Sequence, residues 1–132
     1  MERAKLIDLT RRFTDAFNRN DLDALMAFFS DDGVYDEFNG KRSRGKAAIR
    51  AAFGPQFTGA FGKMEFLEDD IFVDADAGKA MLSWRYTPAL GGKPTSWRGL
   101  DILHFVGGCL IVKRTYAKAS AWLFEDQSEN RE

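Results

Sequence analysis

The spacing of the apolar residues changes once along the 132-residue chain, and this change limits the folds that the chain can adopt. Up to residue 57, apolar residues recur mostly every three or four positions, which is the period of an amphipathic helix. From residue 64 onward, the pattern becomes one of strands separated by short turns. Helices followed by strands predict an α+β domain in which the helices cover one face of an antiparallel sheet.

Three helices and one early strand are expected in the first half. The first helix ends near Asn18, and Asn20 is expected to cap the second by accepting a backbone N–H. A turn at residues 30–33 leads into a strand at residues 34–38. The third helix is expected to end at Gly54-Pro55, because proline cannot continue the helical hydrogen bonds.

The second half is expected to form an antiparallel meander that curves into a cone around the three helices. Its open end would be a natural ligand cavity. We expect one domain over residues 1–124, with Trp122, Leu123 and Phe124 docked on it, and a polar tail over residues 125–132. The expected strands are Met64 to Val73, Ala80 to Thr87, Ser96 to Val106 and Cys109 to Lys118.

The composition excludes several classes of partner. The 19 basic and 20 acidic residues nearly cancel, so we expect neither nucleic acid nor a membrane surface as a partner. One cysteine and one histidine exclude an internal disulfide and a zinc site, and we expect no metal and no cofactor. No segment approaches the roughly 20 apolar residues of a membrane span, and a cytoplasmic protein is expected.

The stretch WRGLDILHF places one acid, Asp101, inside an otherwise apolar strand. If Gly107-Gly108 forms a two-residue hairpin turn, Asp101 lies opposite Arg114. The first interpretation is a structural salt bridge between these two residues. The second is a β-bulge that turns Arg114 away and leaves Asp101 in an apolar cavity, where desolvation would raise its pKa.

The same register decides the environment of several other polar residues. Without a bulge, Arg98, Lys113 and Thr115 share the outer face with His104, as expected for a dimer or solvent face. With a bulge, these three residues would turn inward, where Arg98 or Lys113 could hold a ligand carboxylate.

Four stretches occur in the order FTDAFNRNDLDALMAFFSDDGVYDEF, RGKAAIRAAF, WRGLDILHF and KRTYAK. In this order the sequence resembles the nuclear transport factor 2-like superfamily, and within it the SnoaL-like polyketide cyclases and ketosteroid-isomerase-like proteins. The resemblance implies a cone-shaped fold, a homodimer that packs through the outer sheet face, and a small-molecule ligand in an internal pocket.

The resemblance also implies roles for two acids, with Glu37 at the position of the family's catalytic base and Asp101 at that of its protonated aspartate. Phe13, Phe29 and Phe53 stand where ketosteroid isomerases have tyrosines. The loss of these donors argues against steroid isomerisation. Similarly, Thr115 replaces the aspartate of epoxide hydrolases with this fold, which argues against that chemistry.

The resulting hypothesis is a cofactor-independent proton-transfer enzyme of the isomerase or cyclase type, acting on a small apolar or aromatic compound. Glu37 would be the base and Asp101 the acid or hydrogen-bond donor, although Glu37 could equally be a surface carboxylate near Lys41 or Arg44. The alternative is a non-catalytic ligand-binding or dimerisation domain. The expected ligand-binding residues are Phe13, Phe17, Phe29, Tyr35, Phe53, Trp84, Tyr86, Trp97, Phe105 and Arg114.

Overall fold

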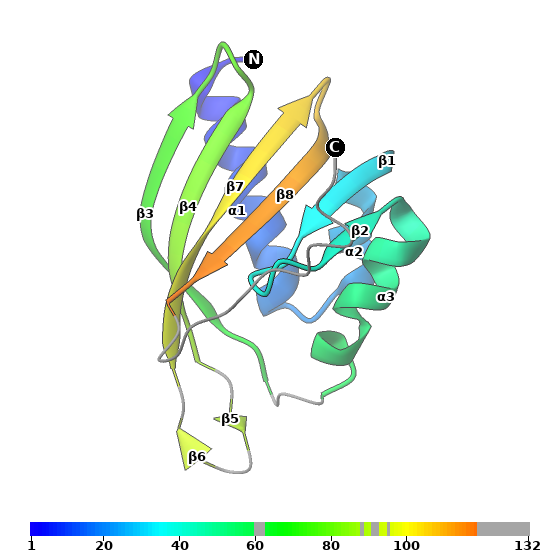
Figure 1. Cartoon of the computed structure of the whole chain (residues 1–132). Coiled ribbons are helices and arrows are strands. Elements are labelled where there is room, and N and C mark those ends of the chain that lie inside the picture. Colours follow the sequence, from blue (N-terminus) through cyan, green and yellow to red (C-terminus); the bar gives the residue numbers. More distant parts are fainter. Residues whose placement is uncertain (60–62, 88, 91–92, 95, 119–132) are drawn as a thin grey trace.

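Helices precede a curved, open sheet in the computed structural model of the chain, which describes residues 1–59, 63–87, 89–90, 93–94 and 96–118 (Figure 1). The predicted docking of residues 122–124 and the polar tail fall outside the described residues. The elements are α1 (Arg3–Asn18), α2 (Leu22–Phe28), β1 (Phe29–Asp36), β2 (Arg42–Arg44), α3 (Lys46–Phe57), β3 (Phe66–Asp74), β4 (Lys79–Tyr86), β5 (Ala89–Leu90), β6 (Lys93–Pro94), β7 (Trp97–Val106) and β8 (Cys109–Ala117).

The connection between α1 and α2 differs from the prediction at one residue. Asn20 has a left-handed φ of 55°, and its N–H donates to the Phe17 carbonyl, while the Asp21 N–H donates to the Ala16 carbonyl. This pair of bonds is a Schellman motif, so Asn20 ends α1 and does not cap α2. The N-cap of α2 is Asp21, whose side chain accepts from the Ala24 N–H at 3.0 Å.

Helix α3 continues past the predicted end at Gly54-Pro55 and reaches Phe57. Proline removes only one donor near the end of the helix, and the Thr58 N–H still bonds to the Gly54 carbonyl at 3.1 Å. The extra half turn places Phe57 against Phe17 of α1, with ring centroids 5.7 Å apart. Packing on α1 therefore outweighs the local preference of proline.

The sheet is mixed, with the strand order β2-β1-β8-β7-β4-β3. The meander from β3 to β8 is antiparallel as predicted, but β1 pairs parallel to β8, with Tyr35 beside Lys113. Strand β1 also begins at Phe29, so the segment expected as a turn at residues 30–33 is an irregular part of this strand. The predicted meander is confirmed, and the parallel pairing of β1 makes the complete sheet mixed, because the meander describes only strands that are neighbours in the sequence.

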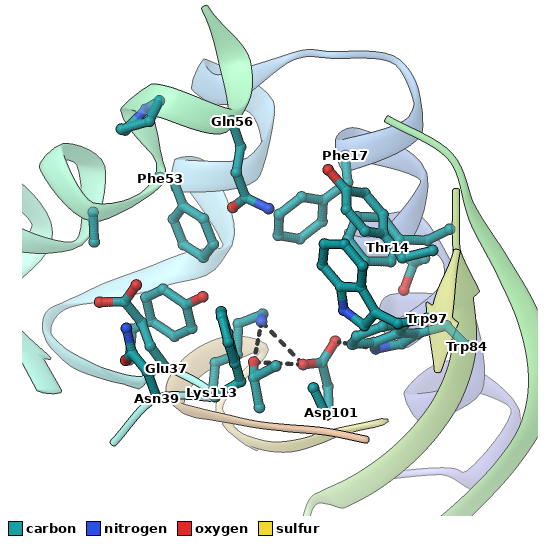
Figure 2. Close-up of a pocket in the computed structure, with 18 residues that line it drawn as sticks. Thr14, Phe17, Glu37, Asn39, Phe53, Gln56, Trp84, Trp97, Asp101 and Lys113 are labelled. Atoms are coloured by element: carbon teal, nitrogen blue, oxygen red, sulfur yellow. Dashed lines mark hydrogen bonds and ion pairs between the residues drawn. The ribbon is translucent and has the colours of Figure 1, made fainter. Parts of the chain in front are cut away.

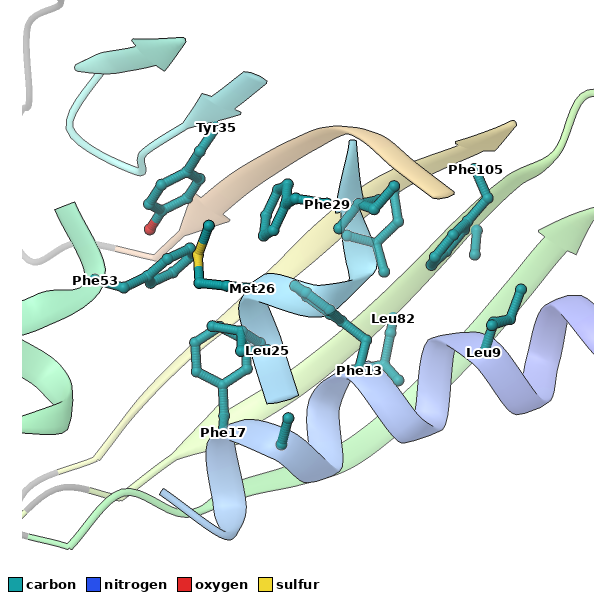
Figure 3. Close-up of a cluster of buried hydrophobic side chains, with 14 of the residues drawn as sticks. Leu9, Phe13, Phe17, Leu25, Met26, Phe29, Tyr35, Phe53, Leu82 and Phe105 are labelled. Atoms are coloured by element: carbon teal, nitrogen blue, oxygen red, sulfur yellow. The ribbon is translucent and has the colours of Figure 1, made fainter. Parts of the chain in front are cut away.

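The core lies between the helices and the inner face of the sheet (Figure 3). Helix α1 packs on β3 and β4, and α3 packs on β1 and β2. The predicted alternation in β4 is confirmed, since Leu82, Trp84 and Tyr86 are buried. None of the described helices combines the length and apolarity that crossing a membrane would require.

Candidate functional site

The β7–β8 hairpin contains one extra residue, and this residue decides which side chains face inward. The turn has the predicted geometry, with positive φ at Gly107 and Gly108. The pairing then shifts by one residue between Phe105 and His104, which leaves Ile111 of β8 as a bulge. Beyond Ile111, every residue of β8 therefore points to the face opposite the predicted one.

The shift rejects the predicted salt bridge between Asp101 and Arg114. Asp101 lies opposite Thr115, and Arg114 points to the outer face, where its Nε lies 3.6 Å from Asp36 Oδ2. Lys113 and Thr115 turn inward instead of joining His104 on the outer face. The bulge interpretation is thus correct in geometry, but the inward turn also supplies Asp101 with a new partner, Lys113.

Asp101 accepts hydrogen bonds from three side chains (Figure 2). Lys113 Nζ lies 3.0 Å and Thr115 Oγ1 2.7 Å from Asp101 Oδ1, and Trp84 Nε1 lies 3.2 Å from Oδ2. Lys113 Nζ also donates to Thr115 Oγ1 at 2.6 Å. Three donors match an ionised carboxylate, which can only accept.

Lys113 is buried among aromatic rings, with only 3% of its surface exposed. Its Nζ lies 4.6 Å from the centroid of the Tyr35 ring and 5.6 Å from those of Phe17 and Phe53. These rings attract the ammonium through their negative faces. Burial of the charge is unfavourable, and the carboxylate of Asp101 compensates for it.

Glu37 follows the end of β1 and is half-buried at the pocket wall. Its Oε2 is buried without a hydrogen-bond partner among the described residues. Burial raises the pKa of this carboxyl group, while the charges of Lys41 and Lys113 partly lower it. Glu37 is therefore a carboxylate with a free acceptor atom, as a general base requires.

The charges of both acids, Glu37 and Asp101, act on the Tyr35 hydroxyl. Burial, followed by the charges of Glu37 and Asp101, raises the pKa of Tyr35 well above its usual value, and a hydrogen bond with Thr115 opposes this rise. Tyr35 thus keeps its proton and stacks on Phe53, with ring centroids 4.4 Å apart.

These groups line one cavity of about 360 Å³. Both predicted acids and six of the predicted aromatic residues line it, whereas Phe13, Phe29 and Phe105 belong to the core and Arg114 lies outside. The lining residues are Thr14, Phe17, Tyr35, Glu37, Phe38, Asn39, Ala52, Phe53, Pro55, Gln56, Phe66, Trp84, Tyr86, Trp97, Asp101, Lys113, Thr115 and Ala117.

Several lining residues were not predicted from the sequence. Gln56 was missed because α3 was expected to end before it, and Phe66 because it lies at the start of an edge strand. Lys113 and Thr115 are expected on the outer face without a bulge and inside with one, and the structure contains the bulge. The available signal was Asp101 itself, because a buried carboxylate in this hairpin needs a nearby cation.

Solved structures with the same fold come from several bacteria. A candidate polyketide cyclase from Xanthomonas campestris pv. campestris superposes with a TM-score of 0.79 at 20% identity, covering 92% of this chain and 96% of that one. An NTF2-like protein of unknown function from Mesorhizobium loti superposes with a TM-score of 0.74 at 22% identity, covering 90% and 96%. At these identities the likeness establishes the fold alone.

A third similar structure is AclR, a candidate hydroxylase from Streptomyces galilaeus, with a TM-score of 0.76 at 18% identity, covering 89% of this chain and 91% of that one. None of the curated proteins compared with the chain matches it. The model of the SnoaL-like domain matches residues 10–114, which is most of the chain and includes Glu37, Asp101 and Lys113. The chain therefore belongs to the SnoaL-like domain family, with a nuclear transport factor 2-like α+β fold.

Proposed function

We propose that this small-molecule-binding protein is an enzyme that transfers protons without a cofactor, acting on a small, largely apolar or aromatic carbonyl compound. One observation carries the proposal: a carboxylate with a free oxygen, on Glu37, and a buried ammonium, on Lys113, line the same aromatic pocket. A base and a cation on opposite sides of a carbonyl compound are what enolisation requires.

In the proposed reaction, Glu37 removes a proton from the carbon next to the carbonyl group, and the electron pair moves to the carbonyl oxygen. An ammonium has three N–H donors, and Lys113 uses two of them on Asp101 and Thr115. The third can bind the developing enolate oxygen. Glu37 then returns the proton to another carbon, which isomerises the substrate. Alternatively, the enolate carbon attacks a second carbonyl group and closes a ring, and the oxygen of that carbonyl takes the proton from Glu37 to become a hydroxyl group.

Asp101 has a different task in this scheme from the one that the resemblance implies. Its carboxylate accepts three hydrogen bonds and fixes Lys113, so Lys113 supplies the donor next to the substrate. Asp101 as the proton donor itself stays a prediction.

Hydrogen–deuterium exchange tests the base directly. In D₂O, wild-type protein is expected to speed the exchange of the protons next to the carbonyl group of 2-tetralone, a bicyclic ketone, followed by NMR. Glu37→Gln should lower this rate by about 10²- to 10⁴-fold, because the amide cannot accept the proton. Glu68→Gln, which alters a surface ion pair with Arg11, is the matched control and should leave the rate unchanged.

The pH profile of the same exchange provides a second readout. Only ionised Glu37 can accept a proton, so the rate should fall as the pH drops through the pKa of this group. Since burial raises that pKa above 4.5, the fall should begin at a higher pH than for an ordinary glutamate. The non-catalytic binding domain would be favoured if Glu37→Gln left the exchange rate unchanged. It would also be favoured if the wild-type protein bound the ketone without speeding the exchange.

One observation favours the non-catalytic alternative. Lys113, Thr115 and Asp101 already form hydrogen bonds with one another, as residues with a purely structural role would. The predicted salt bridge between Asp101 and Arg114 is no part of this alternative, because Asp101 lies opposite Thr115. The cytoplasmic location expected from the sequence stays a prediction.

We also propose that the protein forms a homodimer through the outer sheet face. Phe72, which is 62% exposed, continues across the sheet to Met81 and Ile102 in one cross-strand row. Ile102→Glu should convert a dimer of the wild-type protein to a monomer, as measured by light scattering, because two carboxylates would be buried in contact. An unchanged mass for the variant, or a monomeric wild-type protein, would reject this interface.

A further inference from the structure

The Tyr86 hydroxyl is a polar group in the pocket that the proposed reaction does not use. Tyr86 is 2% exposed and lines the pocket, and its hydroxyl oxygen has no hydrogen-bond partner among the described residues. Burial raises the pKa of this hydroxyl, so it remains a donor. The Gln56 side chain lies close enough to oppose this rise, although its contact with the hydroxyl lacks hydrogen-bond geometry.

Packing holds the Tyr86 ring firmly in place. It stacks on Phe66 with ring centroids 4.4 Å apart and contacts Trp97 edge-on at 4.9 Å. The ring packing therefore keeps the hydroxyl at this place in the pocket, beside Gln56. Because buried polar groups in folded proteins nearly always have a partner, a fixed and unpaired hydroxyl in a cavity points to a group that enters the cavity.

Tyr86 and Gln56 lie away from the charged groups of the site. Figure 2 shows Gln56 on the opposite side of the pocket from Asp101 and Lys113, and Tyr86 lies beside Gln56. The walls of the pocket also include the rings of Phe17, Phe53 and Trp97. The pocket thus has two polar ends and aromatic walls.

We propose that Tyr86 and Gln56 form a second ligand-binding end, which binds an oxygen atom remote from the one at Lys113. The ligand class is then a flat aromatic or conjugated compound with oxygen functions at its two opposite ends. This inference rests on the ligand pocket of the proposed function and adds the feature that selects among aromatic ligands. It does not depend on whether Glu37 moves a proton.

Two probes of the same ring size separate the two ends of the pocket. Calorimetric titration with 2,6-dihydroxynaphthalene and with 2-naphthol gives one dissociation constant for each. The single hydroxyl of 2-naphthol should bind at Lys113, since hydrogen bonds to a charged donor are the stronger ones. Wild-type protein should therefore bind the diol about five- to tenfold more tightly, through one additional neutral hydrogen bond.

Tyr86→Phe removes only the hydroxyl group and should abolish this preference, while the affinity for 2-naphthol stays unchanged. Tyr116→Phe, on an exposed tyrosine, is the matched control and should keep the preference. The melting temperature of unliganded Tyr86→Phe should equal or exceed that of the wild-type protein, because the variant loses an unpaired buried group. A structural role for the hydroxyl would instead lower it.

The inference is overturned if the wild-type protein does not prefer the diol, if it binds neither probe, or if Tyr86→Phe weakens both probes equally. The proposed function fails separately, through an unchanged proton exchange in Glu37→Gln. If the protein discriminates between the two probes but exchanges no protons, the second ligand-binding end is supported and the proposed enzymatic function is rejected. If the protein exchanges protons but does not discriminate between the probes, the enzymatic function is supported and the second ligand-binding end is rejected.

Discussion

Asp101→Asn is expected to destabilise the protein by about 3–5 kcal/mol, measured by urea unfolding at neutral pH, because it leaves a buried ammonium without its counter-charge. Lys113 is 3% exposed, and the Asp101 carboxylate is the acid that lies at 3.0 Å from its Nζ. The aromatic faces of Tyr35, Phe17 and Phe53 attract the cation but do not neutralise it.

A double variant separates the lost charge from other effects of the substitution. Asp101→Asn combined with Lys113→Met removes both charges, and we expect it to recover most of the lost stability, since methionine fills a similar volume without a charge. Asp8→Asn, in the exposed pair with Arg12, should change the stability far less. If Asp101→Asn costs no more than Asp8→Asn, water reaches Lys113 and the pocket is not a dry site.

Gly99→Ala is expected to cost about 2–3 kcal/mol in stability, because the new methyl group has no room. A Cβ at Gly99 would lie under 3.0 Å from the Trp84 ring and from the Tyr116 carbonyl oxygen. The carbonyl belongs to the adjacent strand and cannot yield without widening the sheet. The indole must therefore move, which weakens its bond to Asp101, and the change should appear in both the unfolding curve and the tryptophan fluorescence.

Gly54→Ala is the matched control, since a Cβ there meets nothing within 4 Å. Gly54 lies within α3, where alanine favours the helix, while Pro55 disfavours a helical residue with a Cβ before it, so the variant should change the stability by less than about 1 kcal/mol. Equal stability of the two alanine variants would show that Trp84 can lie elsewhere at no cost, and that its contact with Asp101 is incidental.

The fold could be predicted from the sequence to the extent that its elements are local. The face of α1 that carries Leu6, Phe13 and Phe17 is buried as the spacing predicts, and the Gly107-Gly108 turn has the predicted geometry. The parallel neighbour of β1 could not be predicted in this way. It is a contact between distant segments, and no pattern within β1 specifies which strand lies beside it.

The candidate site could also be predicted only in part, and the error comes from a single residue. Glu37 and Asp101 were placed in one pocket from the family resemblance, and the structure brings both to its wall. Strict alternation through β8 predicts Lys113 on the outer face, and only the bulge alternative turns it inward. The extra residue, Ile111, reverses the faces to which Lys113 and Arg114 point. Ile111 is not a glycine, the residue that often indicates a bulge in a sequence, so the bulge could not be located from the sequence.

The parallel pairing of β1 with β8 also has a consequence for how the protein acquires its structure. Tyr35 and Lys113 are neighbours in the sheet although most of the chain separates them. On the ribosome, the helices and β1 emerge long before their partner strand exists. We expect folding to be slow and to occur in a single late step, because contacts of such large sequence separation must form before the interior closes.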